Sequence, residues 1–109
     1  MELISRDELK AKLDRGDNFK LVMVMAEWAF QAQHIPGSIY INRLHDVAGW
    51  DQNEEIVVYC TGGACLASRT AYDYLVKKKG FTHVRRYAGG LEDWAEAGYP
   101  LEGDLVEEG

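Results

Sequence analysis

Hydrophobic and polar positions divide the chain into short apolar runs separated by amphipathic segments. Apolar residues fill 19–25, "FKLVMVM", apart from one lysine, and 55–59, "EIVVY", is apolar after its first residue. Runs of this length are too short to form helices by themselves and suit strands that are covered on both faces. Two shorter runs, at 38–41 and 83–87, predict two further strands.

Helices are predicted between these strands. The first begins at Ser5, because a serine with Glu8 three residues later is a capping-box pattern, and it ends at Gly16. Strands that alternate with helices predict an α/β sandwich around a mostly parallel sheet with right-handed crossovers. The other predicted helices are "EWAFQAQ", Leu66 to Lys79, and "LEDWAEAG".

Length and charge narrow the class of protein. A chain of 109 residues forms one domain with its own core, at about 4–101, followed by an acidic, frayed tail over 102–109. The net charge of −6 argues against a nucleic-acid partner, which requires a basic face. No segment has the roughly 18 apolar residues of a membrane span, and the N-terminus lacks a signal-peptide core. We therefore expect no membrane partner and a cytoplasmic location.

Both cysteines of the chain, Cys60 and Cys65, lie in the loop after the predicted strand 55–59. Ligands of parallel α/β proteins gather beyond the carboxyl ends of the strands, near helix N-termini. The pair Gly62-Gly63 allows successive backbone N–H groups to point inward, which would stabilise a thiolate at Cys60. The alternative is that Cys60 is a small buried hydrophobic residue. That inert role is favoured for Cys65.

Three collinear segments between about Ser5 and Pro100 carry a family resemblance. They are "HIPGS", "IVVYC" with the loop and helix that follow it, and "YAGGLEDWAEAGYP". Together they resemble the rhodanese-like domain family, with "ISRDELKAKLDRG" in place of the usual first helix. The resemblance implies a three-layer sandwich with a central, mostly parallel five-stranded sheet and no cofactor.

The resemblance also implies a function. Cys60 would be the catalytic nucleophile of a sulfurtransferase or sulfane-sulfur carrier, which forms a persulfide and transfers the sulfur to a thiol, cyanide or a protein. Small molecules or proteins are the expected donors and acceptors, and their identity and the oligomeric state stay open. No acidic residue occurs in 61–67 to oppose the persulfide anion. The expected substrate-binding backbone N–H groups belong to Thr61, Gly62, Gly63, Ala64 and Cys65.

The sequence departs from the family pattern in two places. Many members have Asp and Arg at the end of the first core strand, where this chain has Met23 and Met25, and two methionines there predict a more apolar rim of the site. Members that use thiosulfate place Arg or Lys after the cysteine, whereas residues 61–68 contain none. Because thiosulfate is a dianion, we expect it to be a poor donor compared with persulfides or polysulfide.

Two other activities are conceivable for a cysteine loop of this kind. Phosphatase relatives of this fold need an arginine six positions after the cysteine, and here that position is Leu66, which argues against phosphoester hydrolysis. Cys65 is a possible resolving thiol, which would attack a persulfide and leave a Cys60–Cys65 disulfide. A non-catalytic binding or redox-sensing domain that uses this pair is therefore the alternative function.

The remaining candidate motifs have structural interpretations. The three histidines and two cysteines show no zinc-ligand spacing, so no metal site is expected. His34 is expected to be a hydrogen-bonded residue of the "HIPGS" turn. Gly89-Gly90 opens the last helix and lacks the G-x-G-x-x-G pattern of a dinucleotide site.

Overall fold

The computed structural model of the chain describes residues 1–41, 47, 49–62 and 66–105. Its strands form one parallel sheet in the order β2-β1-β3-β4, so the first strand in the chain lies inside the sheet and the second at one edge. This arrangement confirms the predicted α/β class. The strands are β1 (Lys20–Met23), β2 (Ser38–Tyr40), β3 (Glu55–Tyr59) and β4 (His83–Arg86).

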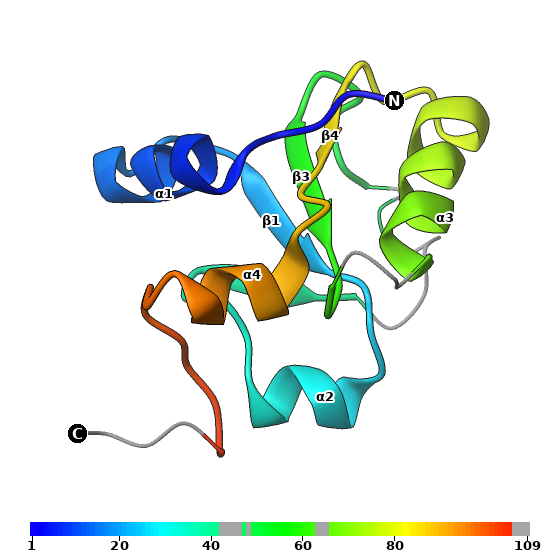
Figure 1. The fold of residues 1–109 in the computed structure, drawn as a ribbon. Coiled ribbons are helices and arrows are strands. Elements are labelled where there is room, and N and C mark those ends of the chain that lie inside the picture. Colours follow the sequence, from blue (N-terminus) through cyan, green and yellow to red (C-terminus); the bar gives the residue numbers. More distant parts are fainter. Residues whose placement is uncertain (42–46, 48, 63–65, 106–109) are drawn as a thin grey trace.

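Helices cover both faces of the sheet and complete a three-layer sandwich (Figure 1). α1 (Arg6–Arg15) and α4 (Gly90–Glu96) lie on one face, and α3 (Ala67–Asp73) lies on the other. α3 continues as a π-helical turn, Tyr74–Lys78, and the chain leaves it at Gly80, whose φ of +74° is a left-handed conformation. The short α2 (Glu27–Ala32) lies beyond the carboxyl end of β1.

The described sheet has four strands instead of the expected five. At the β4 edge the N-terminal segment makes an isolated parallel bridge between Leu3 and Arg86. Two hydrogen bonds hold it, from Ile4 N to Arg86 O (3.0 Å) and from Arg86 N to Glu2 O (2.9 Å). The pairing stops there because Ser5 already caps α1 and turns the chain away from the sheet.

The cap of α1 follows half of the predicted capping box. The Ser5 hydroxyl accepts a hydrogen bond from the backbone N–H of Glu8 at 3.1 Å. The carboxylate of Glu8 does not return to Ser5 and instead binds the guanidinium of Arg85, with Nη2 to Oε1 at 2.9 Å. This ion pair ties α1 to β4 and shows that Arg85 points to the α1 face of the sheet.

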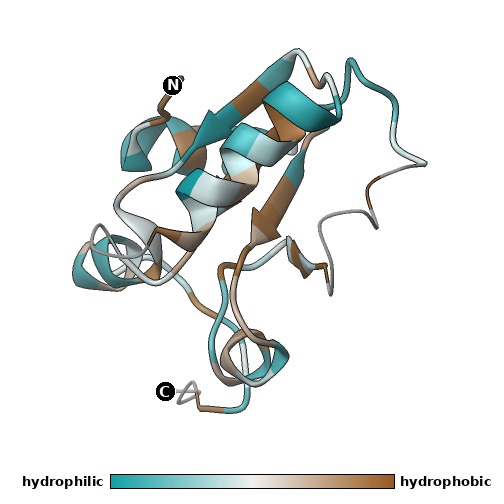
Figure 2. Ribbon diagram, turned by 90° about the vertical axis from the view of Figure 1, so that its right-hand side faces the viewer, coloured by the Kyte–Doolittle hydropathy of each residue, from teal (hydrophilic) through white to brown (hydrophobic). Residues whose placement is uncertain are grey.

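Two hydrophobic clusters lie on the two faces of the sheet. Side chains along β3 point to the two faces in turn. Val57 and Tyr59 belong to the cluster under α1 and α4, and Ile56 and Val58 belong to the cluster under α3. Figure 2 shows long hydrophobic stretches in the strands and a mixture of hydrophilic and hydrophobic residues in the helices, while β4, HVRR, is mostly hydrophilic. This pattern is the physical reason why two-sided apolar strands in the sequence predict a covered parallel sheet.

Residues 102–105 are held against α2 and the residues that follow it, rather than frayed as expected. Glu102 and His34 exchange backbone hydrogen bonds of 2.9 and 2.8 Å, and Asp104 N donates to the carbonyl of Gln31 at 2.8 Å. Gly103 permits this approach, since a Cβ atom there would lie 2.4 Å from a backbone oxygen of the last residue of α2. The rest of the predicted tail, 106–109, lies outside the described residues. Among the described residues, no helix is long and apolar enough to cross a membrane.

Candidate active site

Cys60 is the first residue after β3, at the carboxyl edge of the sheet. Its side chain turns to the α3 face, where Sγ lies 3.6 Å from the hydroxyl oxygen of Ser68. The carbonyl oxygen of Gly62 lies 3.9 Å from the same sulfur. Cys60 is almost completely buried, with 1% of its surface exposed. The thiol therefore lies inside the junction between β3 and α3, with polar groups around it.

A buried arginine donates a hydrogen bond to Ser68. Arg86, at the end of β4, is 9% exposed, and its Nε donates a hydrogen bond of 2.8 Å to the Ser68 hydroxyl oxygen. Ser68 itself is 1% exposed. Sequence reasoning missed this arrangement. The available signal was the alternation in β4, which places Arg86 on the same covered face as Val84.

The Gly89-Gly90 pair supports the backbone of the cysteine loop. α4 begins at Gly90, as predicted, with a φ of +66°. Its next two backbone N–H groups bind the loop, from Leu91 to the carbonyl of Cys60 at 2.9 Å and from Glu92 to the carbonyl of Thr61 at 2.8 Å. The amino end of α4 thus fixes where the chain leaves β3.

The predicted amide cradle is described only at its beginning. Thr61 is exposed and Gly62 is buried. Gly63, Ala64 and Cys65 lie outside the described residues, so their roles as anion donors or resolving thiol stay predictions.

An acidic side chain approaches the loop from α4, against the expectation of surroundings free of carboxylates. An idealised Cβ on Gly62 would lie 2.7 Å from Glu92 Oε2, so the carboxylate covers the backbone of this residue. The sequence of the loop contains no acid, but the fold brings one from 30 residues further along the chain. Glu92 therefore adds negative charge beside Gly62.

The two methionines do not both form the rim of the site, which corrects the sequence prediction. Met23 is completely buried in the cluster under α1 and α4, opposite Tyr59 in the β1–β3 register. Met25 is partly buried and packs against the same cluster. Alternation in β1 turns Met23 to the face away from the Cys60 side chain, where it is part of the hydrophobic core.

Tyr59, the last residue of β3, binds the "HIPGS" turn through its hydroxyl group. The buried hydroxyl of Tyr59 donates to Ser38 Oγ at 2.9 Å and accepts from the backbone N–H of Ile35 at 3.0 Å. Burial raises the pKa of Tyr59 to about 12, against the smaller lowering effect of these two hydrogen bonds. His34 is hydrogen-bonded, as expected, because its Nδ1 lies 2.7 Å from the carbonyl of Phe30 and its ring stacks on that side chain.

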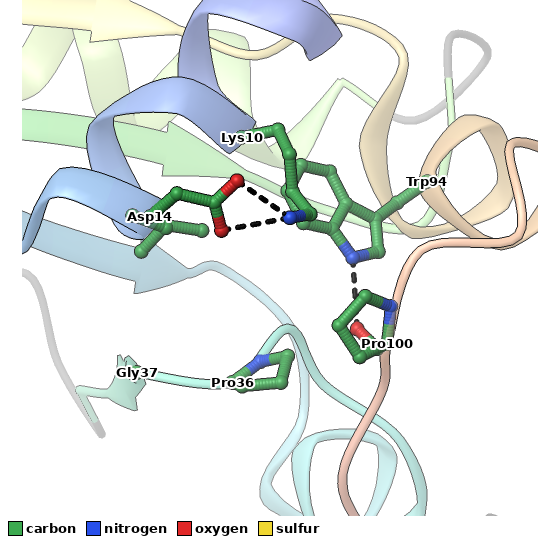
Figure 3. Close-up of a pocket in the computed structure, with 7 residues that line it drawn as sticks. Lys10, Asp14, Pro36, Gly37, Trp94 and Pro100 are labelled. Atoms are coloured by element: carbon green, nitrogen blue, oxygen red, sulfur yellow. Dashed lines mark hydrogen bonds and ion pairs between the residues drawn. The ribbon is translucent and has the colours of Figure 1, made fainter.

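A separate cavity of about 360 Å³ is lined by residues of α1, the "HIPGS" turn and α4, and by Pro100 (Figure 3). The indole of Trp94 faces it and donates to the carbonyl of Pro100 at 2.9 Å, while an ion pair between Lys10 and Asp14 borders it. None of its lining residues comes from the segment between Cys60 and Ser68. Within the described part of the chain, no three His, Cys, Asp or Glu side chains gather as metal ligands.

Comparison with known families identifies the domain. The sequence pattern of the rhodanese-like domain family matches residues 5–97, most of the chain and all of the site described above. The chain therefore belongs to the rhodanese-like domain family. No curated protein sequence gives a significant match.

Solved structures share the fold over nearly the whole chain. A protein from Bacillus halodurans has 24% identity and a TM-score of 0.83, with 98% of this chain and 85% of that chain covered. The rhodanese-like domain of an Anabaena protein has 25% identity and a TM-score of 0.81, with 100% and 84% covered. A thiosulfate sulfurtransferase from Pseudomonas aeruginosa has 21% identity and a TM-score of 0.75. This chain is covered to 94% there but spans only 20% of that enzyme.

Proposed function

We propose that the domain is a sulfurtransferase or sulfane-sulfur carrier that forms a persulfide on Cys60. The observation that carries the proposal is the position of this thiol, at the carboxyl end of a central parallel strand and 3.6 Å from a buried hydroxyl that a buried arginine holds. Family membership and the fold shared with a thiosulfate sulfurtransferase support the same chemistry.

The reaction has two displacement steps. The Cys60 thiolate attacks the outer sulfur of a donor such as R–S–S⁻, a new S–S bond forms, and the donor leaves as the thiolate R–S⁻. An acceptor thiolate or cyanide then attacks the terminal sulfur of the Cys60 persulfide. The bond between the two sulfur atoms breaks, its electron pair returns to Cys60 as thiolate, and the acceptor leaves as a persulfide or as thiocyanate.

Persulfides and polysulfide are the proposed donors, in preference to thiosulfate. Residues 61–68 carry no cation that would bind a dianion, and Glu92 adds a carboxylate beside Gly62. A thiosulfate ion has both of its charges near the transferred sulfur, so it is repelled more strongly than a singly charged persulfide.

Thiocyanate formation tests the proposal. The protein is incubated with cyanide and either glutathione persulfide or thiosulfate, and kcat/KM is measured for the native chain, Cys60→Ser and Cys65→Ser. We expect turnover with the persulfide in the native and Cys65→Ser proteins, slower turnover with thiosulfate, and none in Cys60→Ser. Equal turnover in folded Cys60→Ser would refute the assignment.

The second candidate function is a binding or redox-sensing domain without turnover. It is favoured by the burial of Cys60, because a thiol that is 1% exposed admits a donor only after its neighbours move. Mild oxidation followed by mass measurement separates the two functions. A Cys60–Cys65 disulfide in a protein that turns over no donor supports sensing, whereas two unchanged thiols exclude this form of it.

A further inference from the structure

Arg86 and Ser68 form a short hydrogen-bonded chain that ends at the sulfur of Cys60. Arg86 comes from β4, Ser68 from the first turn of α3, and Cys60 follows β3, so three elements meet at this point (Figure 1). The distances are 2.8 Å from Arg86 Nε to Ser68 Oγ and 3.6 Å from Ser68 Oγ to Cys60 Sγ. All three side chains are at least nine-tenths buried.

The donors and acceptors in this series of hydrogen bonds follow from the chemistry of the three side chains. A guanidinium has donors and no acceptor, so the Ser68 oxygen must accept from Arg86. The neutral Cys60 thiol donates to the same Ser68 oxygen across 3.6 Å. Once the thiol has lost its proton, the sulfur is an acceptor, and the Ser68 hydroxyl proton is within reach of it over the same distance. A hydroxyl that donates to sulfur stabilises a thiolate more than a neutral thiol.

The surrounding charges act in opposite directions on the sulfur. Arg86 carries a positive charge, and its burial weakens the screening of that charge by water. Glu92, from α4, opposes it beside Gly62. Arg69 is exposed next to Ser68 on α3, and water screens it more strongly.

We propose that Arg86 is a positioning residue of the sulfur-transfer site, which fixes the Ser68 hydroxyl so that its proton points to Cys60 Sγ and stabilises the anionic sulfur. This inference rests on the proposed function, because an anionic sulfur at Cys60 is the nucleophile of the first step and the leaving group of the second. The cation that the loop lacks is thereby supplied from β4. It acts on the transferring cysteine and leaves the donor's side of the site without a cation.

The neighbouring residue in β4 provides a matched control. Arg85 also carries one positive charge, but its guanidinium binds Glu8 on the α1 face, away from Cys60. Replacing Arg85 or Arg86 by Met changes the net charge equally. Only the Arg86 variant removes the donor to Ser68.

The test is the rate of iodoacetamide alkylation of Cys60 as a function of pH. It is made in a Cys65→Ser background, so that one thiol reacts. Ser68→Ala and Arg86→Met are each expected to raise the midpoint of the rate profile by about 0.5 to 1 pH unit. Arg86→Lys should shift it less than Arg86→Met, because the charge is kept while the fixed geometry of the guanidinium is lost. Arg85→Met should leave the midpoint unchanged.

Two controls keep the outcome interpretable. Circular dichroism confirms folding, and if Arg86→Met does not fold, Ser68→Ala and Arg86→Lys carry the test. The double variant Ser68→Ala with Arg86→Lys should show a smaller added shift from Arg86→Lys than the single variant does, because the arginine acts through the serine. Additive shifts, or equal midpoints for the Arg85 and Arg86 variants, overturn the proposal.

The reactivity of the thiol and the transfer of sulfur are measured in separate experiments. Alkylation requires no sulfur donor, so unchanged midpoints in a protein that still forms a persulfide refute the role of Arg86 alone. A native protein that forms no persulfide refutes the proposed function and with it the role in transfer, whatever the midpoints show.

Discussion

A Cβ atom on Gly90 would lie 2.5 Å from the carbonyl oxygen of Cys60. The helix start and the cysteine loop therefore touch backbone to backbone, and only glycine fits between them. Gly90 also has a φ of +66°. This left-handed conformation is strained for any residue that has a side chain. Gly90 of the family motif thus holds the start of α4 against the backbone of the cysteine loop.

Substituting Gly90 should therefore cost more than substituting a glycine with the same backbone conformation elsewhere. Gly98 has a φ of +76° and open space around its Cβ position. We expect Gly98→Ala to lower the free energy of unfolding by about 1 to 2 kcal/mol, from backbone strain alone. Gly90→Ala should lower it by about 3 kcal/mol or more, because the loop must also move. Urea denaturation compares the two, and equal losses would show that the contact with Cys60 has no energetic weight.

Removing the hydroxyl of Tyr59 should destabilise the "HIPGS" turn. In Tyr59→Phe the buried N–H of Ile35 loses its acceptor, and we expect a loss of about 1 to 3 kcal/mol in the free energy of unfolding. Tyr99→Phe is the matched control, because the Tyr99 hydroxyl bonds Asp7 at an exposed position, 3.0 Å away. Denaturation curves for the two variants that coincide would contradict this prediction.

Stability should fall in alkaline solution. Burial raises the pKa of Tyr59 to about 12, and it also raises the pKa of Tyr87, together with a hydrogen bond to Asp93. A raised pKa stabilises the fold fully below the unfolded value of about 10, and this stabilisation is lost as the pH rises toward the folded value. Tyr59 should contribute a loss of about 2 to 3 kcal/mol between pH 10 and 12. Urea denaturation at several pH values should show a smaller fall in Tyr59→Phe than in the native protein.

Glu92 should discriminate against dianionic donors. In Glu92→Gln the repulsion beside Gly62 is removed, and kcat/KM for thiosulfate should rise about two- to fourfold, with a smaller rise for a singly charged persulfide. Glu96→Gln makes the same charge change one turn further along α4. An equal rise in both variants would indicate an effect of net charge alone and refute the specific role of Glu92.

Local patterns in the sequence predicted most of the fold. The run 55–59 gave the bounds of β3, and Ser5 gave the cap of α1, since both depend on neighbours within a few residues. The glycines at the ends of helices were equally readable, because left-handed conformations at Gly16 and Gly80 favour that residue. The position of Cys60 followed from the end of its strand.

Contacts between distant segments were not readable from the sequence. Arg86 reaches Ser68 across 18 residues, and Glu92 reaches Gly62 only because α4 folds back over the loop. The same cause explains why residues 102–105 pack on α2 instead of fraying. Such contacts depend on how the helices and strands pack together, and the local sequence pattern does not predict that packing.

Intact-protein mass spectrometry after exposure to polysulfide tests the central claim most directly. The native chain and Cys65→Ser should gain the mass of one sulfur atom, and cyanide should remove it, because the terminal sulfur of a persulfide is open to nucleophiles. Folded Cys60→Ser should gain nothing. An adduct that persists in Cys60→Ser, or no adduct in the native protein, would contradict a persulfide carried on Cys60.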